Sequence, residues 1–120
     1  MTSVVSSLRS SVEDRFEEML TASVPTLAYS RNDRQVLDGL ELDFWFPVLK
    51  VAVEINGPVH YFPVYGVSFL AGIRARDARK RLLCKLANIK LYVIQAGDCN
   101  PEKYIPRFER VLRDLRELYF

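Results

Sequence analysis

Two short segments in which apolar and other residues alternate strictly, separated by only four residues, constrain the fold of this chain most. They run from Leu40 to Phe46 and from Val51 to Asn56. Alternation with a period of two is typical of strands that bury one face. Because the connection Pro47 to Lys50 is so short, the two strands are expected to pair antiparallel as a hairpin. We therefore predict a sheet built around two half-buried strands.

The register of this hairpin places two carboxylates opposite each other. A tight turn centred on Val48-Leu49 pairs Phe46 with Val51, and the same register brings Asp43 opposite Glu54. Like charges at opposed positions destabilise a sheet, whereas a divalent cation shared by two carboxylates turns the repulsion into coordination. We therefore predict that Asp43 and Glu54 hold Mg²⁺ or Mn²⁺. The alternative is that both face solvent, and a one-residue slip in the turn would separate them.

The remaining elements follow from helical spacing and from helix-capping signals. A capping box of Ser10 and Glu13 predicts the start of a first helix, and Asn100-Pro101 supplies the N-cap and first residue of a last one. Asn88 suits a left-handed helix end. The expected helices and strands outside the hairpin are Ser11 to Ala22, a possible strand over Thr26 to Ser30, Ile73 to Ala87 with Ala78, Leu82, Leu83 and Leu86 on its apolar side, a buried strand over Leu91 to Gln95, and the helix after Asn100.

These elements predict an α/β fold in the order αβββαβα, with a mixed sheet of about four strands flanked by helices. A hydrophobic content of 49% in 120 residues is enough for one core, so residues 1–120 are expected to form a single domain. No apolar run approaches the length of a membrane span, and the N-terminus lacks the features of a signal peptide. We therefore expect no membrane association and a cytoplasmic location.

The side chains available for catalysis exclude a zinc site of the usual spacing. With two cysteines and one histidine the chain cannot assemble four such ligands, so a metal must be held mainly by oxygen. The single histidine, His60, follows the second hairpin strand after Gly57-Pro58. Next to a metal-bound phosphate it could act as general base or general acid, because imidazole exchanges protons near neutral pH. The alternative is an ordinary packed or surface histidine.

Basic residues concentrate in one stretch of the chain. Residues 72 to 90 contain seven Lys or Arg and one acid, Asp77. Such a cluster is typical either of a polyanion-binding face or of a solvated helix surface. Asp77 either pairs with Arg81 one helical turn away or is a third acidic member of the site. The residues that we expect to hold a nucleic-acid backbone are Arg74, Arg76, Arg79, Lys80 and Arg81.

Three segments between Leu40 and Gln95, DFWFP, VAVEINGPVH and RDARKRLLCKLANIKLYVI, together resemble a known family. The resemblance is to the PD-(D/E)XK nuclease superfamily, in its very-short-patch-repair-like branch and closest to the EDxHD homing endonuclease type. It implies a restriction-endonuclease-like core and metal-dependent hydrolysis of nucleic-acid phosphodiester bonds, with DNA as the expected substrate. It also implies Asp43 as the main metal ligand, Glu54 as the strand carboxylate, His60 as the catalytic histidine and Asp77 as the late acidic residue.

Two positions depart from that pattern or leave it open. The leading glutamate of the pattern falls on Glu13, with Glu17 as the alternate, and the capping role competes for Glu13. Where a standard member of the superfamily has (D/E)xK, this chain reads Glu54-Ile55-Asn56. The resemblance therefore shifts the role of the missing lysine toward His60.

The segment AVEINGPVH also resembles the RAP domain, an RNA-associated relative of the nuclease fold. This alternative implies an RNA-binding or RNA-processing module, with or without catalysis.

For a nuclease that cuts both strands of a duplex, a homodimer would supply the second active site. The last helix offers a surface for it, although the same surface could instead cover the domain's own sheet. Its apolar stripe consists of Phe108, Val111, Leu112, Leu115 and Tyr119.

Overall fold

The computed structural model describes the backbone of residues 4–120 and the side chains of residues 11–120. The order of its elements confirms the predicted α/β fold with a mixed four-stranded sheet. The strands lie in the order β1-β2-β3-β4, the first three antiparallel and β4 parallel to β3. The elements are α1 (Val4–Ser23), β1 (Ser30–Leu37), β2 (Leu40–Phe46), β3 (Val51–Asn56), the 3-10 turn η1 (Pro58–His60), α2 (Val67–Leu86), β4 (Lys90–Gln95) and α3 (Pro101–Tyr119).

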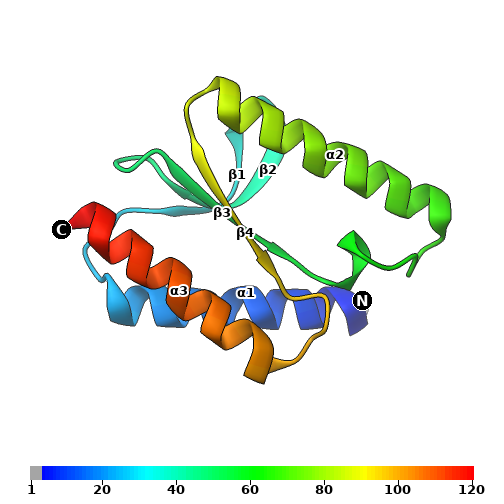
Figure 1. Ribbon diagram of the computed structural model, residues 1–120, viewed down its shortest axis with the longest axis horizontal. Helices are drawn as coiled ribbons and strands as arrows, with labels where there is room; N and C mark the ends of the chain where they lie inside the picture. Colours follow the sequence, from blue (N-terminus) through cyan, green and yellow to red (C-terminus); the bar gives the residue numbers. More distant parts are fainter. Residues whose placement is uncertain (1–3) are drawn as a thin grey trace.

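The sheet separates two layers of helices (Figure 1). α1 and α3 cover one face, where Phe16 packs edge-on against Phe44 and Phe108 at ring-centroid distances of 4.9 and 5.2 Å. α2 lies on the other face, where Cys84 packs into a smaller cluster with Leu42. Because both faces are covered, β3 is buried along its whole length. The prediction of a half-buried strand is therefore wrong for β3.

The hairpin register is confirmed. Phe46 pairs with Val51 and Phe44 with Val53, which is the register that brings Asp43 opposite Glu54. The turn from Pro47 to Lys50 closes with Lys50 in the left-handed backbone conformation (φ 53°) and with its N–H donating to the carbonyl of Pro47 at 3.4 Å. The local alternation of the two strands was thus sufficient to place the two carboxylates.

Two predicted element boundaries are wrong at the N-terminal side of the sheet. α1 begins at Val4 rather than near Ser11, because apolar residues before the capping box continue the helical spacing; the side chain of Ser10 itself lies outside the described residues. The first strand is Ser30–Leu37 rather than Thr26 to Ser30. β1 is an edge strand with an irregular register, so its sequence is mostly polar and resembles a turn.

The predicted inner face of the second helix is also wrong. Leu82 and Leu86 are 56% and 74% exposed, and Cys84 is the side chain that α2 buries. α2 starts at Val67, earlier than the predicted Ile73, and its first turns extend past the sheet in Figure 1. The predicted left-handed helix end at Asn88 is confirmed by its φ of 58°.

The C-terminal elements differ from the prediction in what they bury. β4 is an edge strand with Ile94 as its buried residue, so the expected buried strand is largely on the surface. Asn100 caps α3 as predicted, by accepting the backbone N–H of Glu102 at 3.1 Å. The stripe of α3 packs into the protein's own core, with Leu115 fully buried, so it does not offer the predicted homodimer surface. None of the described helices has the length and apolar character that crossing a membrane requires.

Candidate active site

The two opposed carboxylates lie just beyond the last paired residues of β2 and β3. Asp43 Oδ2 accepts a hydrogen bond from the backbone N–H of Ile55 at 2.8 Å. Glu54 Oε2 accepts one from the backbone N–H of Asp43 at 2.9 Å. Both side chains are buried, at 4% and 5% exposure. The strands are therefore joined here through carboxylates, and the alternative of two solvent-facing side chains is excluded.

Burying these two acids together has an electrostatic cost. The pKa of Glu54 is raised to about 8, first because burial disfavours the ionised carboxylate and second because Asp43 lies beside it. Lys80 acts in the opposite direction and lowers the pKa of Glu54. The two carboxylates therefore repel each other when both are ionised, and Lys80 offsets this repulsion only in part.

Lys80 comes to this site from α2. Its Nζ donates to Glu54 Oε1 at 2.6 Å, and the side chain is only 13% exposed. Among the basic residues expected to hold nucleic acid, Lys80 therefore points into the carboxylate pair. It also brings an ammonium group to the strand carboxylate although Asn56 occupies the position of the usual lysine on β3. Sequence reasoning missed this contact.

A signal for it was nevertheless present in the sequence. Asp77 and Lys80 are three residues apart, so on a helix they share one face. Once Asp77 was assigned to the site, Lys80 had to point the same way. The apolar pattern of Leu82 and Leu86 favoured a different face and concealed this.

His60 and Asp77 form a second pair next to the first. His60 Nδ1 lies 2.8 Å from Asp77 Oδ2, and the two side chains are 14% and 18% exposed. An ionised carboxylate only accepts hydrogen bonds, so Nδ1 carries the proton and donates it. Asp77 therefore pairs with His60 rather than with Arg81, and Nε2 is the ring nitrogen that Asp77 does not engage.

The two glutamates of α1 lie around a different partner, Arg31 of β1. Glu13 Oε2 is 3.4 Å from the Arg31 guanidinium and Glu17 Oε1 is 3.0 Å from it, and Asp14 completes this cluster at 2.8 Å. Since α1 runs on through Glu13, this residue is not part of a helix start. Among the side chains that the structure describes, no group of three or more His, Cys, Asp or Glu residues could hold a metal ion. Glu13 is thus not gathered with Asp43 and Glu54 into such a group.

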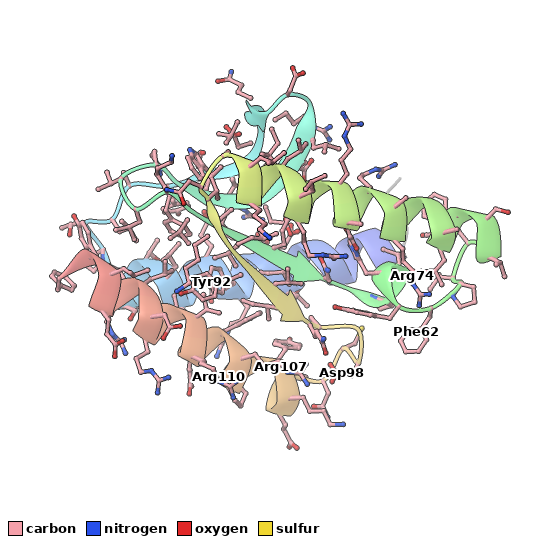
Figure 2. All side chains as sticks on the ribbon, turned by 45° about the horizontal axis from the view of Figure 1, so that its top comes forward. Phe62, Arg74, Tyr92, Asp98, Arg107 and Arg110 are labelled. Atoms are coloured by element: carbon pink, nitrogen blue, oxygen red, sulfur yellow. The ribbon has the colours of Figure 1, made fainter. Side chains whose placement is uncertain are left out.

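A groove of about 370 Å³ opens beside these pairs. Its charged lining consists of Arg34, Glu41, His60, Arg76, Asp77 and Lys80. Arg74, Arg79 and Arg81 are exposed on α2 outside it. Figure 2 shows Arg74 and Phe62 at the end of the molecule where α2 begins. The groove therefore combines a histidine–aspartate pair, an ammonium group and guanidinium groups.

Comparison with protein families, with curated proteins and with solved structures found no match to this chain. What the site does is therefore argued from its own chemistry.

Proposed function

We propose that this protein is a metal-dependent nuclease of the PD-(D/E)XK type that hydrolyses phosphodiester bonds in nucleic acid, with DNA as the expected substrate. The observation that carries the proposal is the buried pair of Asp43 and Glu54. Like charges at opposed positions destabilise a sheet, and burial and then the proximity of Asp43 raise the pKa of Glu54. A bound cation would relieve the repulsion between the two ionised carboxylates. The cytoplasmic location expected from the sequence is part of this proposal.

The donor set fits Mg²⁺ or Mn²⁺. Mg²⁺ prefers oxygen ligands and is commonly held by one or two protein carboxylates, with waters and substrate phosphates as its other ligands. Asp43 and Glu54 would provide the two carboxylates. When bound, the metal would polarise a phosphoryl oxygen and orient a water molecule.

The other residues of the site have separate tasks in this proposal. His60 Nε2 would accept a proton from the attacking water or return one to the leaving group, since Asp77 holds the ring through Nδ1. Lys80 lowers the pKa of Glu54 and so offsets part of the effect of its burial. Its ammonium group would also stabilise the negative charge that develops on the phosphate during the reaction.

The surface around the groove suits a nucleic acid. Basic side chains lie along α2. Aromatic side chains are exposed at the start of α2 and in the segment that precedes it: Phe62 is 54%, Tyr65 53% and Phe69 49% exposed. Guanidinium groups bind phosphates, and exposed aromatic rings stack on unpaired bases. The same combination favours the second candidate, a RAP-like module that binds single-stranded RNA without cutting it.

A cleavage assay separates these two functions. We expect supercoiled plasmid to be cut with Mg²⁺ or Mn²⁺ and not with EDTA, and Asp43→Asn and Glu54→Gln to abolish cleavage. Asp38→Asn is a matched control, because Asp38 is exposed in a turn at a φ of 51° that asparagine also tolerates. Metal-dependent turnover that persists undiminished in both site variants would refute the proposal. Tight binding of single-stranded RNA without cleavage of either substrate would support the second candidate.

A further inference from the structure

A second cavity, of about 490 Å³, lies at the other end of α2. Three segments meet there: the turn between β2 and β3, the last turns of α2 and the start of β4. The charged side chains that line it are all basic and all exposed. We call this cavity the basic groove, and its charged residues are Lys50, Arg81, Lys85 and Lys90.

The cations of the basic groove form no ion pairs with carboxylates of the described residues. Lys50 Nζ donates to the backbone carbonyl of Ala87 at 3.1 Å, and Lys90 Nζ lies 5.1 Å from the centroid of the Tyr92 ring. Asp114 lies close enough to Lys90 to help raise its pKa, after the contact with Tyr92, but it does not form an ion pair with it. Four cations with so little counter-charge repel one another, so the groove favours an anionic partner.

The position of the basic groove relative to the active site indicates what kind of anion it binds. Arg81 lines the basic groove, and its neighbour Lys80 reaches Glu54 in the active site. From Asp77 to Lys85 the helix rises about 12 Å, at about 1.5 Å per residue. Duplex DNA advances about 3.4 Å per base pair along its axis, so this distance corresponds to three or four base pairs. A polyanion can contact both places at once, whereas a small phosphate cannot.

We infer that the basic groove binds the phosphate backbone of the same duplex DNA that is cut at Asp43 and Glu54, three or four base pairs from the cleaved bond. The inference rests on the proposed function and extends it, because it defines how far along the DNA the protein makes contact. A duplex that reaches both sites gains affinity from the groove. A duplex too short to reach it does not.

The test compares the double variant Lys85→Ala/Lys90→Ala with Lys103→Ala/Arg110→Ala. The control pair removes the same charge from exposed positions on α3, where Figure 2 shows Arg110. Binding of a fluorescent duplex is measured in EDTA, so that no cleavage occurs, over a range of salt concentrations. We expect the groove variant to bind about tenfold more weakly, with a salt dependence reduced by about two phosphate contacts. The control variant and the wild type should bind equally, and all three should share one melting temperature.

The outcomes distinguish this inference from the proposed function. If the groove variant binds with the affinity and salt dependence of the wild type while metal-dependent cleavage still requires Asp43, the groove inference is wrong and the nuclease proposal stands. Equal weakening in the control variant would also overturn the inference, since the effect would then come from net charge alone. If the groove variant alone binds weakly but Asp43→Asn cuts normally, the groove binds DNA and the proposed active site is wrong.

Discussion

Replacing Glu54 with glutamine should remove a pH-dependent loss of folding stability that the protein shows when no cation is bound. The pKa of Glu54 is about 8 in the folded protein, against an ordinary value of 4.5, because of burial and then of the neighbouring Asp43. A carboxyl whose folded pKa is raised favours the folded state fully below its unfolded pKa. That contribution is lost as the pH rises from about 4.5 toward 8. Wild-type stability should therefore fall over this window, and the glutamine variant should not show this fall.

The expected size follows from the pKa of Glu54. Each pH unit within the window costs about 1.4 kcal/mol, which gives roughly 3 kcal/mol between about pH 5 and pH 7.5. For a domain of this length, 3 kcal/mol corresponds to about 12 °C in Tm. Glutamine has one acceptor oxygen where the carboxylate has two, and its amide group will face either Lys80 or the Asp43 backbone N–H. That defect costs about 1–3 kcal/mol, but the cost is the same at both pH values.

The assay is thermal unfolding in EDTA at the two pH values, for wild type, Glu54→Gln and the control Glu18→Gln. Glu18 is exposed on α1, away from the acid pair. We expect the variant to gain roughly 3 kcal/mol relative to wild type between the lower and the higher pH, and the control to gain nothing. Mg²⁺ should raise the Tm of the wild type at the higher pH and have little effect on Glu54→Gln. Parallel loss of stability in wild type and Glu54→Gln would refute the reasoning.

Outcomes at five further positions follow from the contacts described above. His60→Ala should lower turnover by about 10²–10⁴ without weakening nucleic-acid binding, and Asp77→Asn should lower it less and alter the pH–rate profile, because the ring is no longer held by a carboxylate. Lys80→Met should lower turnover in single-turnover assays, with partial recovery in Lys80→Arg; full activity in the methionine variant would exclude a catalytic contribution. Phe16→Ala should cost about 3–5 kcal/mol in urea unfolding, because its ring is fully buried between two others. Leu115→Glu should unfold the protein, and a folded variant by circular dichroism would show that α3 does not pack as described.

The parts of the fold that the sequence predicts are those decided by local patterns. The register of β2 and β3 depends on a turn and on alternation within a few residues, and both survive in the structure. The cap of α3 depends on Asn100 and its neighbours alone. These features need no knowledge of the rest of the chain, because their stabilising contacts are between residues close in sequence.

The parts that the sequence does not predict depend on distant contacts. β1 is polar because one of its edges is open to solvent and because Arg31 pairs with acids of α1. Its sequence therefore has the composition of a turn. The orientation of α2 is set by Lys80 and Cys84 packing on the sheet, whereas its exposed leucines suggested another face. β3 is buried on both faces because α1 and α3 cover one face and α2 covers the other. The hairpin sequence alone was thus enough to predict that Asp43 and Glu54 lie opposite each other. It was not enough to predict that Lys80 contacts Glu54.

The carboxylate bridge between β2 and β3 also has a consequence for the order of folding. The hairpin joins residues close in sequence, so it can close early, whereas Lys80 reaches Glu54 only when α2 docks. During that interval the two acids meet without their lysine. The early hairpin should therefore form faster when Glu54 is protonated, and refolding should slow as the pH rises above the ordinary glutamate pKa of 4.5. A divalent cation present during refolding should restore the rate, so the ion proposed for the reaction would also speed the closing of the strand pair proposed to hold it.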